Sequence, residues 1–118
     1  MPFVQAPAVS AIAFRLSAAL ENYQSQFDRL SDPWSQRREY DLVSRVFDQI
    51  RMLKGALPQL SVDMVEVLIS HVELMKALWL SGSSNGEADP ASLEGVRSRH
   101  REAVDRMHMH CLRIFRRE

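Results

Sequence analysis

The sequence has little of what several protein classes require. It contains a single cysteine among 118 residues, which excludes an intrachain disulfide and favours a reducing compartment. No stretch offers the roughly 18 uninterrupted apolar residues of a membrane-spanning helix. The N-terminus also lacks the basic start of a secretory signal peptide. These absences predict a cytoplasmic protein that does not interact with membranes.

An excess of charge of one sign is missing too. The chain balances 15 Lys and Arg against 15 Asp and Glu, whereas nucleic-acid-binding domains carry a basic excess or patch. Thirteen of the cationic residues are arginine, a bias that we attribute to a GC-rich genome. Hydrophobic residues make up 46%, which is ordinary for a globular protein. We therefore expect a single folded domain over residues 1–118, since this length suffices for one hydrophobic core.

Alternation of apolar and polar residues with period two, the pattern of half-buried strands, is absent as well. Apolar residues instead recur at spacings of three and four in four stretches. The sequence predicts helices over about 8–30, from 33 until Gly55 and Pro58 break the pattern, over 61–80, and from 90 to the C-terminus. Joined mostly by short turns, they predict an all-α fold, an antiparallel up-down-up-down four-helix bundle.

Residues that begin helices support these boundaries. Asp32 is suited to cap the second helix with Pro33 in its first turn, and Ser61 is suited to cap the third. The Gly/Ser-rich stretch that follows predicts a flexible connection at about 81–89. Because the third helix is apolar around most of its circumference, we expect it to be central in the bundle.

The segment RMHMHC, residues 106–111, gathers the side chains that metal sites use. At 100° per residue, however, His108 and His110 fall on opposite flanks of the fourth helix, while Met109 faces away from the core. Met107 and Cys111 fall in the buried stripe. Ligands on one helix must lie three or four residues apart to converge on a metal, so the two histidines do not form a pair.

The remaining metal candidates are His108 with Cys111, joined by His71 or by His100. Such ligands would favour Zn or Cu(I), and a metal or ligand sensor that uses His100, His108 and Cys111 is the first alternative function. We instead expect Met107 and Cys111 to be core packing, with no metal or cofactor. His100 is expected to be a core histidine with hydrogen-bond partners, with a pH switch or a ligand role as the alternative.

Catalytic patterns are also lacking. His108 and Cys111 lie one turn apart, but a nucleophilic thiol needs exposure that a core position denies. The chain has no phosphate-binding Gly-rich loop, no His-Glu-x-x-His and no paired inward carboxylates. We therefore expect a protein that is not an enzyme.

Nucleic-acid binding is the second alternative function. The turn around Gly55 outlines a helix-turn-helix, but the third helix carries Asp63, Glu66 and Glu73, which would repel phosphate. The fourth helix is rich in arginine, at Arg97, Arg99, Arg101, Arg106, Arg113, Arg116 and Arg117. Acidic residues alternate with these, so we expect a solvated face of mixed charge rather than a nucleic-acid surface.

The leading hypothesis is a small helical-bundle interaction or regulatory protein, such as an adaptor, a regulatory subunit or a chaperone-like protein. It would act by surface contacts on another protein or on a second copy of itself, most simply as a dimer. The predicted partner-binding residues are large apolar side chains that lie off the core stripes or at their edge, namely Phe14, Trp34, Met52, Leu74 and Met109.

Overall fold

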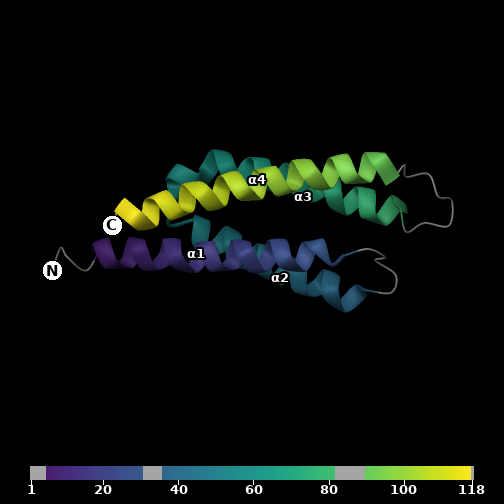
Figure 1. The fold of residues 1–118 in the computed structure, drawn as a ribbon. Coiled ribbons are helices and arrows are strands. Elements are labelled where there is room, and N and C mark those ends of the chain that lie inside the picture. The colour runs from purple at the N-terminus through teal and green to yellow at the C-terminus, as the bar shows by residue number, and fades with distance from the viewer. Residues whose placement is uncertain (1–4, 31–35, 82–89, 118) are drawn as a thin grey trace.

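The prediction of an all-α bundle is confirmed. A computed structural model describes residues 5–30, 36–81 and 90–117 of the chain. These residues form helices α1 (Gln5–Asp28), α2 (Arg37–Lys54), α3 (Ser61–Ser81) and α4 (Pro90–Arg117), with a 3-10 turn, η2 (Pro58–Leu60), before α3. Successive helices run in opposite directions, so that α1 begins and α4 ends at the same end of the bundle (Figure 1).

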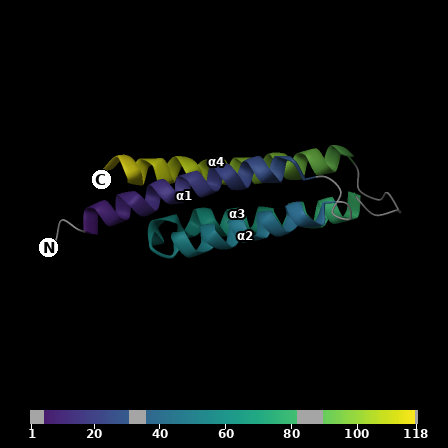
Figure 2. The ribbon, with the colours of Figure 1, turned by 90° about the horizontal axis from the view of Figure 1, so that it is seen from below.

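Each helix lies at one corner of an elongated bundle. One view pairs α3 with α4 and α1 with α2 (Figure 1), and the view turned by 90° pairs α1 with α4 and α2 with α3 (Figure 2). The backbones of α1 and α2, α1 and α4, and α3 and α4 pack closely, whereas those of α2 and α3 lie further apart and the two helices meet through side chains such as Phe47 and His71. The extents are 60 × 25 × 17 Å and the radius of gyration is 16.0 Å, against about 13.5 Å for a compact domain of this length.

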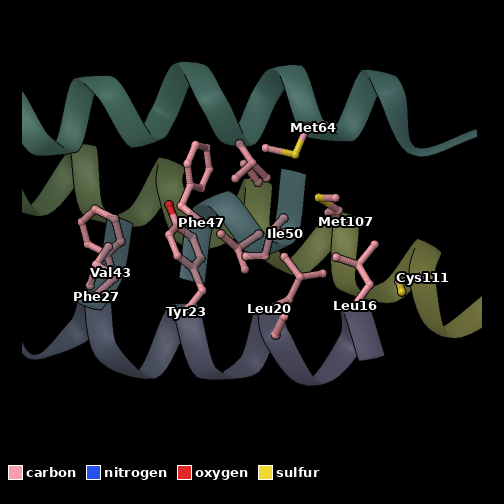
Figure 3. Close-up of a cluster of buried hydrophobic side chains, with 14 of the residues drawn as sticks. Leu16, Leu20, Tyr23, Phe27, Val43, Phe47, Ile50, Met64, Met107 and Cys111 are labelled. Carbon is pink, nitrogen blue, oxygen red and sulfur yellow. The ribbon is translucent and has the colours of Figure 1, made fainter. Parts of the chain in front are cut away.

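The core is built from the stripes that the sequence predicts on the first, second and fourth helices. Apolar side chains from all four helices meet along the axis of the bundle (Figure 3). Burying a Leu, Ile or Phe side chain contributes about 1.5–3 kcal/mol each, so these contacts are the main source of stability. The core side chains labelled in the figure are Leu16, Leu20, Tyr23, Phe27, Val43, Phe47, Ile50, Met64, Met107 and Cys111.

Two expected helix starts differ in the structure. Helix α2 begins at Arg37 with Gln36 as its N-cap, whereas Asp32 and Pro33, the expected start, lie outside the described residues. The Ser61 hydroxyl donates a hydrogen bond back to the Pro58 carbonyl, at 2.8 Å, because η2 runs directly into α3. The predicted flexible connection at about 81–89 falls almost wholly outside the described residues.

The expectation that the third helix is central is wrong. Helix α3 presents one side to the core, through residues such as Val67 and Leu78, and leaves the opposite side open to solvent. The reason is that only the α4 backbone packs closely along this helix, while α2 contacts it through ring side chains such as Phe47 and Tyr40. In the described part of the chain, no helix is long and apolar enough to cross a membrane.

Candidate functional site

A buried cluster of one tyrosine and two histidines joins three helices. The Tyr23 hydroxyl of α1 lies 2.7 Å from Nδ1 of His71 on α3 and 2.7 Å from Nε2 of His100 on α4. A hydroxyl has one proton to donate and lone pairs to accept with. Tyr23 therefore donates to one imidazole and accepts an N–H from the other, and we call these three residues the Tyr–His cluster.

Burial dominates the electrostatics of the Tyr–His cluster. Desolvation lowers the pKa of both His71 and His100 to about 4, and for His100 the neighbouring His71 lowers it further. Burial also raises the pKa of Tyr23 well above its usual value. All three groups are therefore neutral at pH 7, which suits a hydrogen-bonded network in a core of low polarity.

Aromatic packing also brings α2 to the Tyr–His cluster, so that all four helices meet there. The ring of Phe47 on α2 stacks on His71 at a centroid distance of 4.2 Å and an angle of 9°. Phe27 packs against His100 at 4.5 Å. Each helix thus supplies one ring or more to this level of the bundle, and the hydrogen bonds fix how the helices are aligned along their axes.

The two histidines of RMHMHC lie on opposite flanks of α4, as the helical angles predict. His108 faces α1, where its Nε2 shares a 2.7 Å hydrogen bond with the Ser17 hydroxyl and lies 3.5 Å from a Glu21 carboxylate oxygen. His110 faces α3 and donates from Nδ1 to the Asp63 carboxylate, at 2.7 Å. Both are therefore engaged in helix-to-helix contacts.

Cys111 is a core residue. Its side chain is buried, and the thiol donates to the Ala13 carbonyl at 3.0 Å. Burial raises the pKa of the Cys111 thiol to about 11. A thiol must lose its proton to bind metal or to attack a substrate, so this position opposes both.

The three candidate metal ligands are not brought together. His100 bonds to Tyr23, His108 to Ser17 and Cys111 to the Ala13 backbone. Among the residues described, no three His, Cys, Asp or Glu side chains are grouped as a metal ion would require.

The arginines of α4 are largely engaged within the chain. Arg97 donates to the Phe27 and Leu30 carbonyls at the end of α1. Arg106 pairs with Glu66 at 3.0 Å, and Arg99 with Glu73 at 3.7 Å. These contacts engage arginines in the first two thirds of the helix, where acidic partners offset their charge.

The most unusual surface is on α3. Large apolar side chains, four of them more than half exposed, lie along the solvent-facing side of this helix, and the ring of Trp79 at its end also packs on Tyr40 of α2 at a centroid distance of 6.1 Å. We call this surface the α3 outer face. It comprises Val62 (74% exposed), Val65 (54%), Leu68 (38%), Ile69 (55%), Val72 (57%), Trp79 (44%) and Leu80 (43%).

The predicted partner-binding residues have mixed outcomes. Phe14, Met52 and Met109 are exposed, at 59%, 76% and 55%, but they lie on three different helices, and Phe14 also packs on Phe115 at 5.8 Å. Leu74 is 1% exposed, because it lies on the core side of α3, so its predicted place on the outer surface is wrong. Trp34 lies outside the described residues.

Sequence reasoning missed two features of the site. It placed His100 in the core but did not identify Tyr23 and His71 as the residues that bond with it. A helical wheel gives directions on one helix and no distances between helices. It also assigned almost every apolar residue of α3 to the core. The available signal was that this helix has more apolar residues than one buried face can accommodate.

A surface hollow of about 740 Å³ lies along α4 beside Asp63 of α3. Carboxylates and cations alternate around it, including Asp63, Glu102, Arg106 and Arg113. This mixture gives no single ligand chemistry, so the geometry favours the α3 outer face over the hollow as a binding site. No family model, curated protein or solved structure matches this chain.

Proposed function

We propose that the chain is a small cytoplasmic interaction protein that acts through contacts of the α3 outer face, without catalysis. The observation that carries the proposal is the row of exposed apolar side chains from Val62 to Leu80. Monomeric proteins rarely expose a contiguous apolar patch of more than a few hundred Å², and larger patches mark partner surfaces. The partner is another protein or a second copy, with a dimer the simplest assembly.

The packing of the rest of the molecule supports a binding role for this face. The polar groups that could do chemistry are tied into helix-to-helix contacts, as in Tyr23 with His71 and His100. The thiol of Cys111 is buried. The α3 outer face is the surface where apolar area is left over, and covering it would release free energy of about 25 cal/mol per Å².

Photo-crosslinking in the native host tests this function. A benzophenone amino acid replaces Val65 on the α3 outer face, and in a matched control it replaces Ser44, which is exposed on α2. We expect a discrete adduct on illumination from position 65 and none from position 44. Equal labelling at both positions, or no adduct at either, would contradict the proposal.

A further inference from the structure

The α3 outer face repeats with the period of a coiled coil. Its central row advances by three and four residues in turn, through Val62, Val65, Ile69, Val72, Lys76 and Trp79. This alternation over about two and a half heptads is the spacing at which apolar residues form the seam between two helices.

The core side of the same helix has an identical repeat. Its row runs through Met64, Val67, His71, Leu74 and Leu78, also in steps of three and four. The two rows are offset by two residues, which is about 200° around the helix, so they lie on opposite sides. Helix α3 therefore has apolar rows on two sides, and the single chain covers the core row but leaves Val62, Val65, Ile69 and Val72 of the other row more than half exposed.

We propose that this exposed row is covered by α3 of another copy of this chain, packed antiparallel across a two-fold axis. This rests on the proposed function, namely that the α3 outer face is a contact surface. In antiparallel coiled coils, the first apolar position of each heptad in one helix faces the second apolar position of a heptad in the other helix. A two-fold axis between Ile69 and Val72 satisfies this for the whole row, and it sets Ile69 against Val72, Val62 against Trp79 and Val65 against Lys76.

Charge supports the same alignment. Lys76 is the only Lys or Arg of α3, whose acidic residues are Asp63, Glu66 and Glu73. In the antiparallel pair, Lys76 lies level with Val65 of the copy, so the two Lys76 side chains are kept apart. A parallel pair would instead place the two Lys76 side chains against each other, and a polar residue at such a position decides alignment in coiled coils.

The size of the surface also fits a pair of copies. The 21 residues of α3 span about 31 Å, and a specific interface needs roughly 800 Å² from each partner. The seven apolar side chains of the α3 outer face supply most of an apolar centre. The ion pairs Arg106–Glu66 and Arg99–Glu73 along one edge supply a polar rim of balanced charge.

Light scattering coupled to size exclusion tests for the dimer. We expect twice the chain mass for the unmodified protein and the single chain mass for Ile69→Glu, with unchanged helicity by circular dichroism. The matched control is Met52→Glu, since Met52 is 76% exposed on α2 and should leave the dimer intact. A single-chain mass for the unmodified protein at millimolar concentration overturns the proposal, as does a dimer that survives Ile69→Glu.

Disulfide trapping tests the orientation. Val62→Cys and Trp79→Cys chains are purified separately and then oxidised alone or mixed, with buried Cys111 as a common background. The antiparallel pair predicts cross-linked dimers only in the mixture, joining one variant to the other. Efficient cross-linking of either variant alone overturns the antiparallel alignment.

The two proposals can fail separately. An adduct from position 65 to a different protein, with a monomeric purified chain, keeps the function and rejects the second copy. A monomeric chain with no adduct rejects both.

Discussion

At the scale of single residues, the Tyr23 hydroxyl has the most demanding position in the core. It must donate its one proton to one imidazole nitrogen and accept an N–H from the other, each 2.7 Å away. Both histidines must be neutral for the three groups to satisfy one another without a charge in the core. The network therefore stabilises one alignment of α1, α3 and α4, because sliding any of them leaves a buried polar atom without its partner.

Removing that hydroxyl should destabilise the fold. We expect Tyr23→Phe to lower the free energy of unfolding by about 1–3 kcal/mol, since two ring nitrogens lose their partner. Urea denaturation followed by circular dichroism measures it. His71→Phe, which keeps a ring on Phe47, and the double variant complete a cycle whose coupling energy isolates the Tyr23–His71 bond. Additive effects of the two substitutions would show that this bond contributes nothing.

The same histidines predict how stability depends on pH. Their pKa values of about 4 in the folded chain lie below the value of about 6.5 in an unfolded chain. Between these values the unfolded chain binds more protons, so stability is complete above about pH 6.5 and falls as the pH drops toward 4. The urea concentration at the midpoint of unfolding should decrease as the pH is lowered from 7.5 to 5. Asp and Glu contribute little to the pH dependence of stability in this range. A His71→Gln, His100→Gln chain should show a flatter profile, and an equally steep one would contradict this origin.

At the scale of helices, Arg97 closes the end of α1. Its guanidinium donates to the Phe27 and Leu30 carbonyls at the end of the helix, where carbonyls run short of intrahelical partners, although the Phe27 carbonyl also accepts from the Leu30 N–H. We expect Arg97→Ala to cost about 0.5–2 kcal/mol, because it removes charged donors from a helix C-terminus. The matched control is Arg99→Ala on the same helix, whose ion pair with Glu73 is exposed and should be worth at most about 1 kcal/mol. Urea denaturation compares the two, and equal losses would contradict the role of Arg97.

The sequence predicted where the helices lie better than it predicted which helices pack against one another. Periodicity identifies which side of a helix is apolar, so the buried stripe through His100, Met107 and Cys111 and the opposite flanks of His108 and His110 were correct. It does not count how many neighbours a helix has. The apolar residues of α3 were therefore assigned to one core, although they form two separate rows. For the same reason Leu74 was placed at an outer edge. The Tyr–His cluster was out of reach for the same reason, since it depends on distances between helices.

At the scale of the whole molecule, the four sides of the bundle are not equivalent. Helix α2 packs closely on α1 but meets α3 only through side chains such as Phe47 on His71, although it buries Tyr40, Val43, Phe47 and Ile50. Helices α1 and α4 each pack closely on two others. Segments with fewer buried contacts open at lower free energy.

Native-state hydrogen exchange should therefore show α2 as the least protected helix at its centre. The opening that exposes the amides around Val43–Phe47 should cost less free energy than the opening that exposes those around Leu16–Leu20 or Val104–Met107. Rates measured at increasing low urea concentrations separate such partial opening from complete unfolding. Identical opening free energies in all four helices would mean that the bundle opens only as a unit.

The rate at which the Cys111 thiol is alkylated reports how often the fold opens. Its thiol is the only one in the chain, is fully covered, and has a pKa raised to about 11, so reagents reach a reactive thiolate only when α4 separates from α1. The rate of alkylation under native conditions therefore counts these separations without any label or mutation. At constant pH, dimer formation should slow this alkylation and Tyr23→Phe should speed it, which makes one thiol a common readout for both effects.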